Sequence, residues 1–115
     1  MAVRRLKRRP EFLQVASTGQ KAAMPGLVLQ ARARGDDAPF RVGFTASRKV
    51  GGAVQRNRAK RRLRAAVEQV LTERGRAGSD YVVIARADTV ARPFALLIQD
   101  LGRALERVER PGTGR

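Results

Sequence analysis

The stretch from Val42 to Arg64 reads VGFTASRKVGGAVQRNRAKRRLR and restricts the fold more than any other part of the chain. Its first residues alternate between apolar and polar or small side chains, a period of two that is typical of a strand. The glycine pair Gly51 and Gly52 then breaks this pattern, and a run rich in Arg and Lys follows. We therefore expect a strand to turn here into a helix whose basic side stays uncovered.

That helix is expected to run from about Ala53 or Arg56 to Glu73. Its apolar side chains fall on one stripe at a helical period, comprising Ala59, Leu63, Ala66, Val67, Val70 and Leu71. Its other side is basic, with Arg56, Arg58, Lys60, Arg61, Arg62 and Arg64 around Asn57. Like charges one turn apart destabilise a helix by about a few tenths of a kcal/mol each, which favours a bound polyanion. The alternative is a solvated face, but such faces usually contain Glu as well, and none occurs from Phe40 to Val67.

Composition supports a folded domain that meets a polyanion. The 115 residues suffice for one domain, and the 43% hydrophobic fraction supplies a core. Lys and Arg number 25 against 10 Asp and Glu, a formal charge of +15. Such an excess is self-repelling unless a polyanion neutralises it. Nucleic acid is the expected partner, and an anionic membrane surface is a weaker alternative because the basic helix lacks Trp and Phe.

Several classes of chemistry are not expected. With no Cys and no His, the chain has no disulfide, thiol nucleophile, imidazole base or ordinary zinc site. No apolar run reaches the ~20 residues that span a bilayer, and no signal-type segment follows the N-terminus, so we expect a cytoplasmic protein with no membrane partner. The one adjacent acidic pair, Asp36 and Asp37, lies in GDDAP and indicates a turn. We therefore predict no catalytic residue and no small-molecule substrate, and we assign no residue to a protein-bound metal.

The remaining pattern predicts one domain over residues 1–110. In its first half we expect a basic arm over 1–9, a short helix from Pro10, a strand over 27–34, a turn over 35–39 and a strand over 40–47. After the basic helix we expect a loop over 75–80, a strand over 81–86, a helix from Pro93 and a disordered tail over 111–115. In the strand over 40–47, Val42, Phe44 and Ala46 should face the core. The opposite face, with Arg41, Gly43, Thr45 and Ser47, should be open to a ligand.

The order of residues in this region resembles a known signature. RVGFTASRKVG at residues 41–51, followed by Ala53, Val54 and RNRAKRRLR at residues 56–64, resembles the protein subunit of bacterial ribonuclease P. RLKRRPEF at residues 5–12 is similar to that family's opening, and DYVVIAR at residues 80–86 is similar to its fourth strand. The resemblance covers nearly the whole domain in the right order.

The resemblance implies a fold and a function. The fold would be an α+β, two-layer α-β-β-β-α-β-α sandwich with a central mixed sheet and a left-handed β-α-β crossover, its missing strand at residues 20–24 or 48–50. The protein would be an auxiliary subunit of the enzyme that removes the 5′ leader of precursor tRNA. Catalysis would belong to the RNA subunit, which would bind most of the Mg²⁺, and the protein would be a monomer in a 1:1 complex. The alternative is a structural RNA-binding protein, such as a small ribosomal protein.

The resemblance also implies two binding surfaces. Contacts to the catalytic RNA would come from Arg56, Asn57, Arg58, Lys60, Arg61 and Arg64. Contacts to the single-stranded leader would come from Phe12, Val28, Thr45, Ser47, Arg48 and Lys49. The residues alone favour an ordinary core role for Phe12. Three positions depart from the family pattern, because Ala16 and Gln30 stand where aromatic residues are common, and Gly52 stands where Asn is common.

Overall fold

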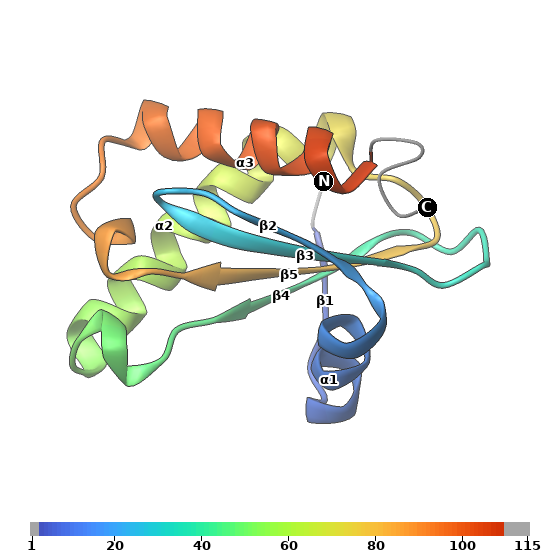
Figure 1. The fold of residues 1–115 in the computed structure, drawn as a ribbon, viewed down its shortest axis with the longest axis horizontal. Coiled ribbons are helices and arrows are strands. Elements are labelled where there is room, and N and C mark those ends of the chain that lie inside the picture. The colour runs from blue at the N-terminus through green and yellow to red at the C-terminus, as the bar shows by residue number, and fades with distance from the viewer. Residues whose placement is uncertain (1–2, 110–115) are drawn as a thin grey trace.

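A computed structural model describes residues 3–109 as three α-helices and a five-stranded sheet (Figure 1). The strands are β1 (Arg4–Arg5), β2 (Gln20–Ala23), β3 (Leu27–Ala33), β4 (Arg41–Thr45) and β5 (Ser79–Ala85). The helices are α1 (Arg9–Thr18), α2 (Ala53–Arg74) and α3 (Phe94–Glu109), with 3₁₀ turns at Arg48–Val50 and Ala87–Thr89. Among these described helices, none is long and apolar enough to cross a membrane.

The sheet is mixed, in the order β1-β4-β5-β3-β2. Strand β4 is parallel to both β1 and β5, whereas β3 is antiparallel to β5 and β2. Helix α2 therefore joins two parallel neighbours, β4 and β5, as a β-α-β crossover. The predicted α+β class and mixed sheet are confirmed, and the hand of the crossover stays a prediction.

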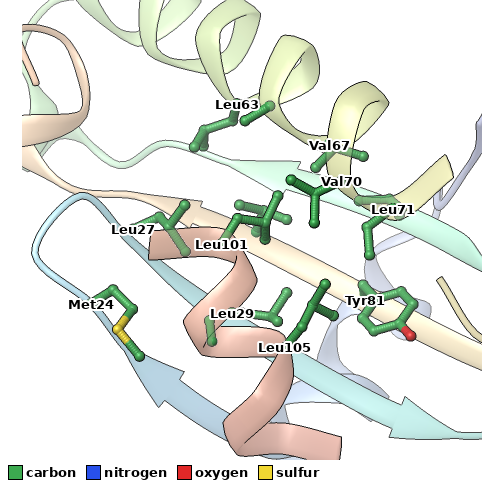
Figure 2. Close-up of a cluster of buried hydrophobic side chains, with 14 of the residues drawn as sticks. Met24, Leu27, Leu29, Leu63, Val67, Val70, Leu71, Tyr81, Leu101 and Leu105 are labelled. Carbon is green, nitrogen blue, oxygen red and sulfur yellow. The ribbon is translucent and has the colours of Figure 1, made fainter. Parts of the chain in front are cut away.

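One face of the sheet packs against α2 and α3 and holds the main core (Figure 2). The stripe predicted for α2 is confirmed, because its buried residues are Ala59, Leu63, Ala66, Val67, Val70 and Leu71. Leu27 and Leu29 from β3 and Leu101 and Leu105 from α3 are also fully buried in this cluster. Each such leucine contributes about 1.5–3 kcal/mol of burial free energy, so this layer supplies most of the stability.

The opposite face of the sheet is covered only in part, by α1 (Figure 1). Val15 of α1 packs with Leu6 and with Val82 of β5 in a second, smaller cluster. Because Val83 faces the main core and Val82 faces α1, β5 is covered on both faces. This explains the nearly continuous apolar run that predicted an interior strand.

The structure shows how the N-terminal arm packs and decides between the two candidates for the missing strand. The described part of the arm is no free extension, because Arg4 and Arg5 pair with β4 and Leu6 is only 5% exposed. The missing strand is Gln20–Ala23, whereas Arg48–Val50 is a 3₁₀ turn. The predicted tail over 111–115 lies outside the described residues.

Candidate nucleic-acid interface

A row of side chains crosses the sheet on the face that α1 covers only in part. The strand register places Thr45 beside Ile84, Ile84 beside Val28, and Val28 beside Ala23. The first three are half-buried and Ala23 is exposed. Residues paired in register point to the same side of a sheet, so these four form one surface, called here the cleft row. It offers an apolar floor with a hydroxyl at one end.

Phe12 of α1 borders the cleft row. Its ring lies against Gly43 so closely that a Cβ built there would come within 2.5 Å of the Phe12 Cζ atom. The ring also packs against the cluster of Leu6, Val15 and Val82, yet the residue remains half-buried. Phe12 is thus partly a core residue, as its sequence alone favoured, and partly accessible over Gly43, which lies two residues before Thr45 on the same face of β4.

Helix α1 covers half of the β4 face that was expected to be open. Gly43 lies beneath Phe12, and Arg41 is engaged with the carboxylates of Glu11 and Asp80. Only Thr45 and Ser47 of that face remain for a ligand. The expectation is therefore corrected for the first half of the strand, because α1 docks there.

Beyond β4 the chain supplies hydroxyl and basic groups at the end of the cleft row. Ser47 caps the 3₁₀ turn, with its Oγ accepting a hydrogen bond from the Lys49 backbone N–H at 3.3 Å. Ser47, Arg48 and Lys49 are all exposed. The cap fixes the backbone, while the hydroxyl proton of Ser47 and both cationic side chains stay available to phosphate or sugar.

Two departures from the family pattern border the same surface. Ala16 lies one helical turn after Phe12 and is exposed. Gln30 lies on the α1 side of β3, opposite Val82. Neither side chain offers a ring on which a base could stack, so Phe12 is the aromatic residue at this surface.

The basic side of α2 is accessible. Asn57, Arg58 and Arg61 are exposed, and Arg56, Lys60 and Arg64 are half-buried. Within residues 3–109, none of the five cationic side chains in this set forms a salt bridge with a carboxylate. The structure thus places all six predicted residues on one helix and leaves its five cationic side chains in this set available to a polyanion.

Arg62, on the same helix, has a different role. Its Nε donates a hydrogen bond to the Thr89 carbonyl oxygen at 2.9 Å, and its Nη2 donates to the Arg92 carbonyl oxygen. Both acceptors lie in the connection between β5 and α3. Arg62 therefore links α2 to that connection, which agrees with its omission from the predicted RNA-binding set.

The start of α2 is built around its glycine pair. Gly51 has a φ of 141°, a conformation that side chains rarely adopt. Gly52 is the N-cap, and no side chain caps the helix, so the first-turn N–H groups can meet an anion. Val54 in this turn is 74% exposed.

Sequence reasoning missed two residues of the cleft row, Ile84 and Ala23. Ile84 forms the middle of the cleft row, but it lies in the continuous apolar run of β5, where periodicity does not separate the two faces. Ala23 lies in the short edge strand β2, whose side-chain directions follow only from its pairing with Val28. The strand register was the missing signal in both cases.

An ion-pair network fixes the strands beneath α1. Asp80 is 1% exposed and accepts hydrogen bonds from Arg41 at 2.8 and 2.9 Å and from Arg34 at 2.5 Å. Burial alone would raise the pKa of Asp80, but the hydrogen bonds and charges of Arg41 and Arg34 outweigh it and hold that pKa below its ordinary value. Hydrogen bonding to Asp80 is the largest cause that raises the pKa of Arg41. Arg32 of β3 also lies near this carboxylate, with its Nη1 3.8 Å from Asp80 Oδ2, so the network joins β3, β4 and β5.

Glu11 extends this network to α1. Its Oε1 accepts hydrogen bonds from the backbone N–H groups of Arg8 and Lys7 at 3.0 and 3.1 Å, and these lower its pKa. Its Oε2 accepts a hydrogen bond from Arg41 Nη1 at 2.7 Å. The helix that carries Phe12 is therefore fixed to β4 at the residue next to Phe12.

Of the acidic pair, Asp36 stabilises the turn as expected. Asp36 Oδ1 accepts a hydrogen bond from the Ala38 N–H at 3.0 Å and pairs with Arg34, whose hydrogen bond is the main cause that lowers the pKa of Asp36. This is turn chemistry. Within residues 3–109, no three Asp or Glu side chains gather closely enough to hold a metal ion.

Comparison with known proteins agrees with the resemblance. The sequence model of the family described as Ribonuclease P matches residues 2–109. The chain is 56% identical over 108 residues to the ribonuclease P protein component of Paramagnetospirillum magneticum, covering 90% of this chain and 81% of that protein. It is 54% identical over 103 residues to the ribonuclease P protein component of Gluconacetobacter diazotrophicus, covering 90% and 89%.

Solved structures show the same fold. The RNase P protein of Staphylococcus aureus superposes with a TM-score of 0.76 at 27% identity, covering 94% of this chain and 97% of that one. The RNase P protein of Thermotoga maritima gives 0.74 at 30% identity, covering 91% and 97%. The fold, the order of the signature residues and the family match agree, and the chain belongs to the ribonuclease P protein family.

Proposed function

We propose that this chain is the protein component of ribonuclease P, binding the catalytic RNA through α2 and the 5′ leader of precursor tRNA through the cleft row. The RNA subunit would carry the catalytic groups and most of the Mg²⁺, in a 1:1 cytoplasmic complex. The observation that carries the proposal is that one small domain has two different accessible surfaces, each suited to a different kind of RNA. One is a helix face of unpaired cations, and the other is a half-exposed apolar strip beside an aromatic ring.

The basic side of α2 suits a folded RNA. Arg58 and Arg61 are exposed and can contact phosphates, and an arginine fork can bind a phosphate through two hydrogen bonds. Asn57 lies between them in sequence and offers both a donor and an acceptor. Phosphate contacts position an RNA without reading its sequence, which suits the docking of one large RNA.

The cleft row suits a single strand. A base that is not paired can stack on the accessible part of Phe12 or lie on the apolar floor of Val28 and Ile84. Thr45 and Ser47 offer hydroxyls to sugar and phosphate. Because a single aromatic residue, Phe12, borders the row and none of its four residues is a buried polar group that reads base edges, we expect it to accept leaders of varied sequence.

Reconstitution tests the proposal directly. The purified protein, mixed with its cognate catalytic RNA at low Mg²⁺, should raise the rate of precursor-tRNA cleavage above that of the RNA alone. The protein alone should cleave nothing. Absence of stimulation would contradict the assignment as a functional subunit.

The two surfaces are separable by mutation. Replacing Arg58 and Arg61 by Ala should weaken binding to the catalytic RNA and reduce its salt slope by about 0.7–0.9 per lost phosphate contact. The matched control replaces Arg103 and Arg107 by Ala, because both are exposed on α3 and the same charge is lost. Equal effects of the two double variants would show that only net charge matters and would remove α2 from the proposed interface.

A crosslinking experiment separates this function from that of a structural RNA-binding protein. Precursor tRNA with a photoreactive base in its leader should crosslink to Phe12 or Ser47 within the holoenzyme. A protein that binds only folded RNA would give no crosslink at these residues.

A further inference from the structure

A second concentration of positive charge lies where β1 and the start of α1 meet the start of β4. Side chains there line an open depression of about 480 Å³, called here the basic pocket, which is formed by Arg4, Arg5, Lys7, Arg8, Glu11 and Arg41. None of these residues belongs to the cleft row or to the basic side of α2. The proposed function leaves this charge unexplained.

The single carboxylate of the basic pocket is already engaged. One oxygen of Glu11 accepts from the backbone N–H groups of Lys7 and Arg8, and the other accepts from Arg41. Arg41 is in turn bound to Asp80. Across residues 3–109, Arg4, Lys7 and Arg8 have no carboxylate partner. The exposed cations of the pocket are therefore free for an external anion.

The strand register places the basic pocket on the same face of the sheet as the cleft row. Arg4 pairs with Arg41, so both side chains lie on the α1 side of the sheet. Arg5 lies on the other side, where its guanidinium is 5.6 Å from the centre of the Phe44 ring. Along β4 the α1 side continues from Arg41 through Gly43 to Thr45, whereas α2 packs on the opposite face.

Phe12 lies between the two sites, over Gly43. The four-residue step from Arg41 to Thr45 spans about 13 Å at the rise of a strand. A stacked nucleic-acid strand carries one phosphate per ~3.4 Å, so about four nucleotides, or fewer in an extended strand, would connect the two sites. A strand lying on the cleft row can thus reach the pocket past Phe12.

We propose that the basic pocket binds backbone phosphates of the precursor-tRNA leader, at nucleotides beyond those that lie on the cleft row. This inference rests on the proposed leader-binding function and extends it. Arg4, Lys7 and Arg8 are its available cations, because all three are exposed and none is bound to a carboxylate. Lys7 and Arg8 are the ones to replace, because they lie outside β1 whereas Arg4 lies within it. Because the basic pocket would contact only phosphates, its contribution to leader affinity should depend on leader length and not on leader sequence.

Leader length tests the proposal in the reconstituted holoenzyme. The variant replaces Lys7 and Arg8 by Ala, and a second variant replaces both by Gln to keep the side-chain stems. The charge-matched control is again Arg103→Ala with Arg107→Ala. Equilibrium affinity is measured for precursor tRNAs whose leaders lengthen from none to about twelve nucleotides, and melting temperatures confirm that each variant is folded.

Wild type and control should gain affinity first as the cleft row fills and again as the leader reaches the pocket. Both Lys7 and Arg8 variants should keep the first gain and lose the second, by about tenfold, with the salt slope for long leaders reduced by about 1.4. An equal loss at every length, or weaker binding to the catalytic RNA alone, would overturn the assignment and show that the pocket binds another RNA. Undiminished affinity for long leaders would exclude phosphate binding there. Absence of any length dependence in wild type would instead refute leader binding itself, and the pocket's assignment with it.

Discussion

Replacing Asp80 by Asn tests how the strands beneath the cleft row are held together. The side chain is 2% exposed and lies between the guanidinium groups of Arg34 and Arg41. Asn keeps the shape of Asp but removes its charge and replaces one acceptor oxygen by a donor. Three guanidinium N–H groups donate to the carboxylate, two to Oδ1 and one to Oδ2, so at least one of them would face the amide NH₂ group of Asn.

The expected cost is large but short of complete unfolding. Removing one partner of a buried ion pair typically costs about 3–5 kcal/mol. The lower end applies here, because Arg34 keeps Asp36 and Arg41 keeps Glu11. A domain of this length has a total stability of roughly 6–17 kcal/mol at ~0.05–0.15 kcal/mol per residue, so a loss of about 3 kcal/mol leaves it folded. At about 4 °C per kcal/mol, the melting temperature should fall by about 12 °C.

Urea and thermal unfolding, followed by far-ultraviolet circular dichroism, measure this loss. The denaturation midpoint should fall by about 1–2 M urea with an unchanged slope. Asp36→Asn is the control, because its side chain is 52% exposed although it pairs with the same Arg34. A change in Asp80→Asn no larger than in this control would refute the argument that burial makes the network important.

Three further predictions concern the same elements. Gly43→Ala should lower the free energy of unfolding by about 1–3 kcal/mol, because the new Cβ displaces the Phe12 ring. It should also weaken leader binding without affecting catalytic-RNA binding, and unchanged leader affinity would show that Phe12 takes no part in leader binding. Arg62→Ala should lower the free energy of unfolding by about 2 kcal/mol, whereas Arg61→Ala should leave the melting temperature unchanged and weaken RNA binding. The reverse pattern would mean that Arg61 has the structural role and Arg62 the RNA-binding role. The pKa values of Glu11 and Asp80 are lowered in the folded protein, so in acid the unfolded chain binds more protons than the folded one. The stability that these two carboxylates contribute should therefore be fully present above their ordinary pKa values of 4.5 and 3.8. It should be lost as the pH falls through their folded-state pKa values. In Asp80→Asn this decline should be shallower, and equal declines would contradict the linkage.

The helical parts of the fold could be predicted because their period is long and regular. The stripe from Ala59 to Leu71 repeats over several turns, and every residue predicted for it is buried. Short edge elements gave no such signal. The sequence did not decide whether the missing strand lies at residues 20–24 or 48–50, and the pairing of Gln20–Ala23 with β3 decides it.

The candidate site could be predicted only as far as local sequence determines it. The exposure of Arg58 and Arg61 follows from their place opposite the apolar stripe, but sequence alone gives no reason why Arg62 should instead bind two backbone carbonyls. The covering of Gly43 depends on where α1 docks, a contact between distant segments. Ile84 likewise entered the site through its register with Thr45.

The distribution of carboxylates shows how so basic a chain can both fold and bind RNA. In the described part of the chain, five acidic residues form ion pairs, and all their partners are arginines, as with Asp80, Asp100 and Glu11. Asp100 is 3% exposed and also accepts a hydrogen bond from the Gly26 backbone N–H, so it joins α3 to the β2–β3 turn. These five carboxylates thus hold segments of the fold together, and within residues 3–109 none of them pairs with a cation of α2. Substituting a buried carboxylate should therefore reduce stability, whereas substituting Arg58 or Arg61 should reduce RNA affinity with little effect on the fold.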